Sequence, residues 1–258
     1  MIPPATKLYR YMSFDQFLQI VFTKKITAVL PRKWDDGFEQ YWLEYLKTPD
    51  GQNSLERYVR EHFKDEKEYV PGSVAVLESL VGTLYNTVYA ICFTEAGDEE
   101  LLWGAKNKDD KTIMICTTAS NVNRLGNNLE MFGPTLERIQ YDLEDHGGIN
   151  ELLNKLGFVV GMAELNSPYD LVLHKRKCFA YEKEIRLLCS PDDLNALKDN
   201  DGKRRETVEL DLPENFIQSV MVCPTAKDRH VKLVRDICGH FGLPFLGKSD
   251  LYDFKVLD

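Results

Sequence analysis

Short apolar runs rich in β-branched and aromatic residues recur along this chain of 258 residues and restrict its fold more than any other feature. Each run has the length and the residue types of a β-strand. Between them, helical spacing is found in short stretches, and strands and helices do not alternate strictly. The sequence therefore predicts an α+β fold with mixed or antiparallel sheets and flanking short helices. The predicted strands are 8–11, 26–30, 88–93, 112–117, 137–143, 179–189, 207–212 and 217–223.

Two predicted helices have defined ends. Ser13 precedes an apolar stripe at helical spacing, and Gln16 completes a capping box, so a helix begins after Ser13. The segment 226–241 carries a similar stripe and ends at Gly242. Residues 35–86 carry helical spacing of their own, after which the strand pattern resumes. We therefore expect a single domain over residues 1–258, with a helical insertion at about 35–86.

The composition is that of a globular protein. Apolar residues make up 43% and aromatic residues 11% of the chain, which is too much for a disordered protein. No run approaches the about 20 apolar residues of a membrane span, and the N-terminus does not read as a signal peptide. The six cysteines are scattered, as in reduced proteins. We expect a cytoplasmic protein with no membrane partner, and a net charge of −9 argues against broad binding to nucleic acid.

Several common catalytic motifs are absent from the sequence. It has no GxGxxG, GxxxxGK, HExxH or GxSxG, which weakens assignment to dinucleotide-binding dehydrogenases, P-loop NTPases, zincins and α/β-hydrolases. Cys223, His230, Cys238 and His240 are residue types that bind zinc. On a helix, however, positions 230, 238 and 240 point in different directions, so we predict no metal site.

Glu182, Glu184 and Arg186 alternate along the predicted strand 179–189, so they would share one of its faces. One interpretation is a solvated strand edge with an ion pair. If the face lines a cleft, one carboxylate can instead stabilise a developing cation while the other supports it. The nearby basic run 174–177 is typical of a solvated loop.

Of three more residues, Arg10 and Trp103 have two interpretations each, and Thr94 marks the end of a strand. Arg10, between two tyrosines, is either a surface residue with a packed stem or a bidentate ligand for phosphate. Thr94 closes an apolar strand. Trp103 is either a core residue or a platform for a flat ligand ring.

Four stretches, taken in order, resemble a bacterial family of unknown function that includes abortive-infection proteins of the AbiGi kind. The chain departs from that family after Trp103, where Gly104-Ala105-Lys106 replaces the usual His-Tyr, and at Gly37, where the family has proline. The matching stretches are Leu8-Tyr9-Arg10-Tyr11, Asp35-Asp36-Gly37-Phe38-Glu39, Cys92-Phe93-Thr94 with Trp103, and Lys177 with Tyr181-Glu182-Lys183-Glu184-Ile185-Arg186.

The layout is also similar to the ADP-ribosyltransferase fold, in particular that of DNA-modifying toxins. This resemblance implies NAD as the substrate, with the main roles on Arg10, Thr94 and Glu184. Glu184 would stabilise the ribose cation and Arg10 would hold the NAD phosphates. The nucleotide site would also include Tyr11, Trp103, Glu182 and Arg186. The resemblance also implies a macromolecular target, either protein or nucleic acid. It further implies a role in phage defence or as a toxin, with an antitoxin or defence-system partner.

Two other functions stay open at this point. A binding module that keeps the scaffold without catalysis is favoured by the departures from the family pattern. Glu182 and Glu184 would then face solvent, paired to lysines and far from Arg10. A metal-dependent nuclease or phosphoesterase would gather Asp35, Asp36, Glu39 and the late glutamate pair around one cation.

Overall fold

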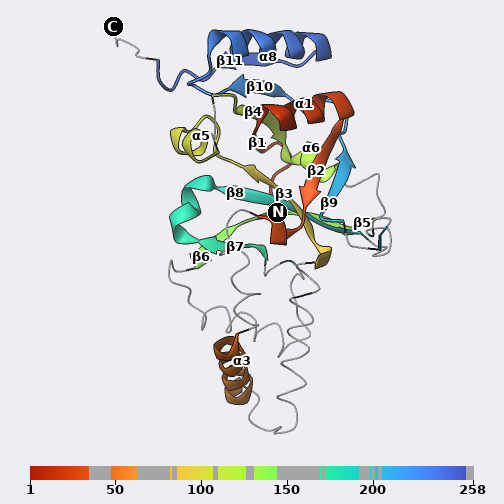
Figure 1. The fold of residues 1–258 in the computed structure, drawn as a ribbon, viewed down its shortest axis with the longest axis vertical. Helices are drawn as coiled ribbons and strands as arrows, with labels where there is room; N and C mark the ends of the chain where they lie inside the picture. Colours follow the sequence, from red (N-terminus) through yellow and green to blue (C-terminus); the bar gives the residue numbers. More distant parts are fainter. Residues whose placement is uncertain are drawn as a thin grey trace.

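Figure 1 shows the fold of the protein in a computed structural model. It describes residues 1–34, 48–62, 82, 86–106, 110–125, 131–143, 169, 172–191, 198, 201–202 and 205–253. Most of the predicted helical insertion lies outside these residues. Within it, α3 (Pro49–His62) is helical, as the apolar spacing in this stretch predicts.

The described strands confirm an α+β fold built on a large mixed sheet (Figure 1). All strand pairs in this sheet are antiparallel except β10 with β11. A second, small sheet pairs β6 (Gln140–Leu143) with β7 (His174–Arg176). The strands of the large sheet are β1 (Lys7–Met12), β2 (Lys25–Val29), β3 (Tyr89–Thr94), β4 (Ile113–Thr118), β5 (Met131–Arg138), β8 (Glu184–Pro191), β9 (Thr207–Asp211), β10 (Ser219–Val222) and β11 (Phe245–Lys248).

Strand β3 lies at the junction of the large sheet. One edge pairs with β8 along its whole length. The other edge pairs with β1 at Thr94 and with β2 at Ala90. Because Thr94 is opposite both Tyr9 and Glu184, the sheet brings the N-terminal strand and a late strand to the same end of β3.

Short helices flank this sheet. Helix α1 (Phe14–Thr23) has the predicted capping box, in which Ser13 and Gln16 each accept a hydrogen bond from the other's backbone N–H. Helix α8 (Asp228–Phe241) packs against β10 and β11 and ends at Gly242, in the left-handed conformation. The remaining short helices are α5 (Glu100–Lys106), α6 (Ala119–Asn123), η1 (Pro31–Lys33) and η3 (Lys177–Glu182).

The predicted strand 179–189 is wrong in its first part. Residues Lys177–Glu182 form the 3₁₀ helix η3, Lys183 is left-handed with φ 42°, and the strand begins at Glu184. Long-range contacts override the β propensity of this segment. The Glu182 carbonyl accepts a hydrogen bond of 2.5 Å from the Thr94 hydroxyl, and the Lys183 carbonyl accepts one of 3.1 Å from the Glu95 N–H.

The core lies between α1, α8 and the sheet. It includes side chains that are almost fully buried from each of these elements, such as Phe17, Ile91, Val220 and Val234. No helix in the described part of the chain is both long and apolar enough to cross a membrane.

Candidate functional site

A cleft of about 840 Å³ opens beside the junction of β1, β3 and β8. The charged side chains that line it include Arg10 from β1, Glu182 from η3 and Glu184 from β8. Thr94 and Arg186 also contribute to its wall. The register of the sheet explains this convergence, since β3 pairs with both β1 and β8 at Thr94.

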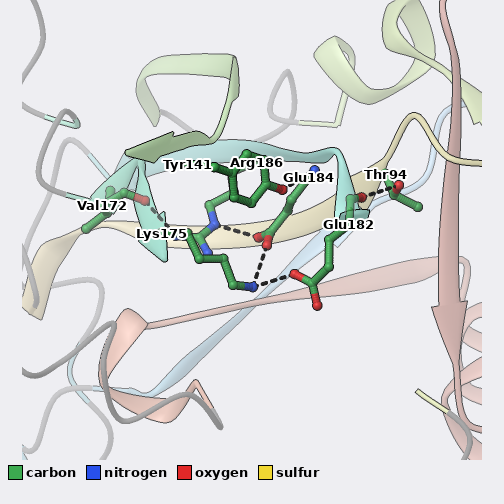
Figure 2. Close-up of polar contacts among 7 residues, drawn as sticks. All are labelled: Thr94, Tyr141, Val172, Lys175, Glu182, Glu184 and Arg186. Atoms are coloured by element: carbon green, nitrogen blue, oxygen red, sulfur yellow. Dashed lines mark hydrogen bonds and ion pairs between the residues drawn. The ribbon is translucent and has the colours of Figure 1, made fainter. Parts of the chain in front are cut away.

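The two glutamates and two cations form one network in the cleft wall (Figure 2). Lys175 Nζ lies 2.5 Å from Glu182 Oε2 and 3.0 Å from Glu184 Oε2. Arg186 Nε donates a hydrogen bond of 2.6 Å to Glu184 Oε1. Each of these four side chains is at most 7% exposed. The interpretation as a solvated strand edge is therefore wrong.

Backbone and aromatic contacts fix Arg186 and Glu184 in place. Arg186 Nη1 donates 2.6 Å to the Val172 carbonyl (Figure 2), and the guanidinium lies 3.9 Å from the centroid of the Trp34 ring. The Glu184 N–H donates 2.7 Å to the hydroxyl of Tyr141. The Glu184 carboxylate is therefore held from both its backbone and its side-chain partners.

Opposing effects set the charge of Glu184. Burial raises the pKa of this carboxyl, but the positive charges of Arg186 and Lys175 outweigh burial and hold the pKa of Glu184 well below its usual range. The neighbouring Tyr141 is also affected, because burial raises the pKa of its phenol to about 12. At neutral pH the site therefore holds an ionised carboxylate beside a neutral phenol.

Arg10 also lines the cleft and keeps an unused donor. Its Nη1 donates 2.6 Å to the Cys92 carbonyl, whereas Nε is buried and has no hydrogen-bond partner among the described residues. Burial lowers the pKa of Arg10, and the charge on Glu184 acts in the opposite direction. Buried donors are normally paired, so a bound anion would satisfy this guanidinium.

Thr94 and Tyr11 reach the cleft through hydroxyls that have backbone partners. The Thr94 hydroxyl donates to the Glu182 carbonyl and accepts 2.8 Å from the Ala96 N–H. The Tyr11 hydroxyl donates to the Gly97 carbonyl. Thr94 therefore fixes the backbone that carries Glu182.

The structure corrects the assignment of Trp103 to the nucleotide site. Its side chain is 1% exposed and belongs to the core, and it is not among the residues that line the cleft. Its ring packs edge-on against Tyr11, with 4.7 Å between centroids, and its Nε1 donates 2.5 Å to Asp98. Trp103 thus supports the cleft wall from behind.

Sequence reasoning missed two residues of the site. Lys175 belongs to a basic run that reads as a solvated loop, yet its side chain is 7% exposed. Trp34 lines the cleft and covers Arg186, but it stands alone before a polar loop in the sequence. The apolar residues Val172 and Leu173 directly before the basic run were the local signal that β7 is buried.

Among the described residues there is no group of three or more His, Cys, Asp or Glu side chains placed to hold a metal ion. The four candidate zinc ligands on and before α8 belong to the described part of the chain. Asp35, Asp36 and Glu39 lie outside it, so the metal-dependent alternative is not tested at these positions.

Comparison with known proteins gives distant structural matches. No protein family matches the chain, so membership of the AbiGi-like family is not shown, and no curated protein matches it. Thermus sp. 2.9 DarT in complex with carba-NAD+ is 14% identical, with 94% of this chain and 95% of that chain covered and a TM-score of 0.36. The complex with ADP-ribosylated ssDNA is 13% identical, with 95% of each chain covered and a TM-score of 0.38. The DarT complex with NAD+ is 14% identical, with 95% of this chain and 96% of that chain covered and a TM-score of 0.37. Likenesses at this level carry no conclusion about activity.

Proposed function

We propose that this chain is an NAD-dependent ADP-ribosyltransferase-like enzyme. The observation that carries the proposal is a buried Glu184, kept ionised by two cations, in the wall of the same cleft as a half-buried Arg10 whose buried Nε has no hydrogen-bond partner among the described residues. The sequence resemblance to the ADP-ribosyltransferase layout supports the same residues.

In the proposed reaction, the bond between C1′ of the ribose and the nicotinamide nitrogen breaks, and its electron pair leaves with nicotinamide. A nucleophile on the target attacks C1′ and loses its proton, which gives the ADP-ribosylated product. Positive charge develops on the ribose during this step. A fixed carboxylate beside the ribose stabilises that charge without reorganising, and we assign this role to Glu184.

The charges of the cleft suit a diphosphate. Lys175 and Arg186 balance Glu182 and Glu184, which leaves the charge of Arg10 without a carboxylate partner among the described ion pairs. A guanidinium of this kind binds phosphate oxygens through paired N–H donors. We therefore assign the NAD phosphates to Arg10.

Supporting roles follow from the contacts. Arg186 and Glu182 hold the charged network, and Thr94 acts as a positioning residue through the Glu182 backbone. We assign aromatic contacts with the nicotinamide or adenine ring to Tyr11 and Trp34, because these two side chains line the cleft and Trp103 does not.

The test measures NAD consumption, and transfer of label from NAD to protein or nucleic acid, in the presence of cell extract. We expect Glu184→Gln to lose about 10²–10³-fold in rate, the usual effect of removing one preorganised group. Arg10→Gln should instead raise the KM for NAD. Glu209→Gln, on the exposed side of β9, is the matched control and should keep wild-type activity.

Thermal unfolding of each variant shows whether a loss of rate reflects loss of fold. The proposal fails if the wild-type protein leaves NAD untouched with extract present. It also fails if folded Glu184→Gln turns over NAD at the wild-type rate.

The biological setting belongs to the same proposal. A role in phage defence or as a toxin, with an antitoxin or defence-system partner, is supported by the sequence resemblance alone. Whether the target is protein or nucleic acid is determined by measuring which of these two fractions of the extract takes up label from NAD. Growth arrest on expression of the wild type, relieved by Glu184→Gln, would agree with this role.

A binding module without catalysis is the second candidate. The expectation attached to it, that Glu182 and Glu184 face solvent far from Arg10, is wrong, because both side chains are buried in the wall of the cleft that Arg10 also lines. What still favours it is the mutual pairing of the buried charges, which satisfy one another without a ligand. Calorimetric binding of NAD with no turnover under any condition would support it over the enzyme.

A further inference from the structure

Lys175 occupies an unusual place in the cleft wall. It comes from β7, outside the large sheet, and its ammonium group reaches one carboxylate from η3 and another from β8 (Figure 2). The ammonium also lies 4.9 Å from the centroid of the Phe179 ring. The side chain is 7% exposed, so water contributes little to the balance of these charges.

Loss of the cation shared by two buried carboxylates favours proton binding by one of them, because like charges at close range disfavour the doubly ionised pair. Arg186 compensates Glu184 directly through Oε1. The contact that joins both carboxylates is Lys175, whose Nζ lies within 3.0 Å of an oxygen from each.

We propose that Lys175 is a positioning residue that keeps Glu182 and Glu184 ionised together and holds their carboxylates side by side in the cleft wall. The electrostatic part of this inference stands on the geometry. Its consequence for catalysis rests on the proposed function.

The other charged and titratable groups around the pair come from four elements. Arg186 lies on β8, Arg10 on β1, Cys92 on β3 and Tyr141 on β6. Arg10 and Arg186 stay positive and Tyr141 stays neutral across the pH range in which carboxyl groups titrate. A change in that range after substitution of Lys175 therefore reports on the two glutamates.

The direct test follows the glutamate carboxyl carbons by NMR in ¹³C-labelled protein as the pH changes. In Lys175→Met we expect the pKa of one of the two carboxyl groups to rise by about 1 to 3 relative to the wild type. Lys175→Arg keeps the positive charge and should restore the wild-type titration. The matched control is Lys183→Asn, which removes an exposed lysine between the two glutamates and suits the left-handed backbone at this position.

The pH profile of enzyme activity is a second measurement. Substitution of a residue with a merely structural role would not shift this profile along the pH axis. The acid limb of the pH profile of kcat/KM for NAD should shift to higher pH in Lys175→Met, with recovery of activity as the pH rises. Lys175→Arg should return the limb to its wild-type position. An equal loss of activity at every pH would overturn the catalytic part of the inference.

A balanced double variant guards against a failure to fold. Lys175→Met with Glu182→Gln removes one charge of each sign, so the Glu184 carboxyl should titrate below its usual range again. An unchanged titration in folded Lys175→Met, or a raised pKa that persists in the double variant, overturns the proposal. A wild-type protein without NAD turnover refutes the proposed function but leaves the NMR result to decide the role of Lys175.

Discussion

At the scale of single residues, Glu184 links the chemistry of the site to the stability of the fold. Its pKa is held below the usual range by Arg186 and Lys175 in spite of burial. A carboxyl group with a lower pKa in the folded protein than in the unfolded chain contributes stability above the unfolded pKa of about 4.3. That contribution disappears as the pH falls towards the pKa of the group in the folded protein.

We therefore predict a pH-dependent difference in stability between the wild type and Glu184→Gln. At pH 7 the variant should be less stable by about 3 kcal/mol, because it breaks the buried ion pairs of Glu184 with Arg186 and Lys175. The difference should be constant above about pH 5 and should shrink below about pH 4, where the unfolded chain binds a proton first. Urea unfolding at several pH values measures it. A difference that grows as the pH falls would contradict the assigned charge state.

The residues of the site differ in how far the sequence reveals them. Arg10 and Glu184 stand out because charged groups within apolar strands need a partner or a ligand. Lys175 and Trp34 do not stand out, because their burial comes from segments distant in the chain. Trp103 shows the converse, since a lone tryptophan fits a core and a ligand platform equally well until its neighbours are known.

At the scale of elements, local signals locate helix ends. The capping box at Ser13 and the stop at Gly242 are confirmed, because each depends on neighbouring residues alone. The start of β8 was not predictable, because η3 is held by contacts with β3 and Lys175 that no local pattern contains. This break still leaves the two carboxylates adjacent, since Lys175 joins them across it.

The C-terminus of α8 gives a matched pair of substitutions. Gly242 has φ +65°, and an added Cβ would meet no atom within 4 Å, so Gly242→Ala is penalised by its backbone conformation alone. We predict a loss of about 1 kcal/mol in the free energy of unfolding. Gly239 is inside the same helix with equally open space, so Gly239→Ala should gain up to about 1 kcal/mol. Thermal or urea unfolding compares the two, and a loss of stability in both variants would argue against the left-handed stop at Gly242.

At the scale of the whole molecule, the site depends on the order of strands around β3. Apolar runs and turns are legible in the sequence and predict the α+β class. The pairing of β3 with β8 on one edge and with β1 and β2 on the other is set by tertiary packing, which local patterns do not encode. Arg10 and Glu184 can act together only through this arrangement, so the integrity of β3 controls the geometry of the cleft.

Native-state hydrogen exchange tests this central place of β3. Its residues are almost fully buried, Cys92 excepted. One edge of β3 pairs with β8 along its whole length and the other pairs with β2 at Ala90 and with β1 at Thr94, so we expect its paired amides to exchange only when several strands separate together. We predict that β3 amides exchange among the slowest in the described strands and only through global unfolding. Among the described strands, β11 pairs with β10 alone. It alternates exposed and half-buried residues, so its amides should exchange faster, through local opening. The dependence of exchange on denaturant separates the two routes. Global unfolding exposes more surface than local opening, so its free energy falls more steeply with denaturant concentration. If β3 amides exchange as fast as those of β11, with an equally weak dependence on denaturant, then the junction opens locally. A cleft built on that junction would not keep Arg10 and Glu184 in fixed positions.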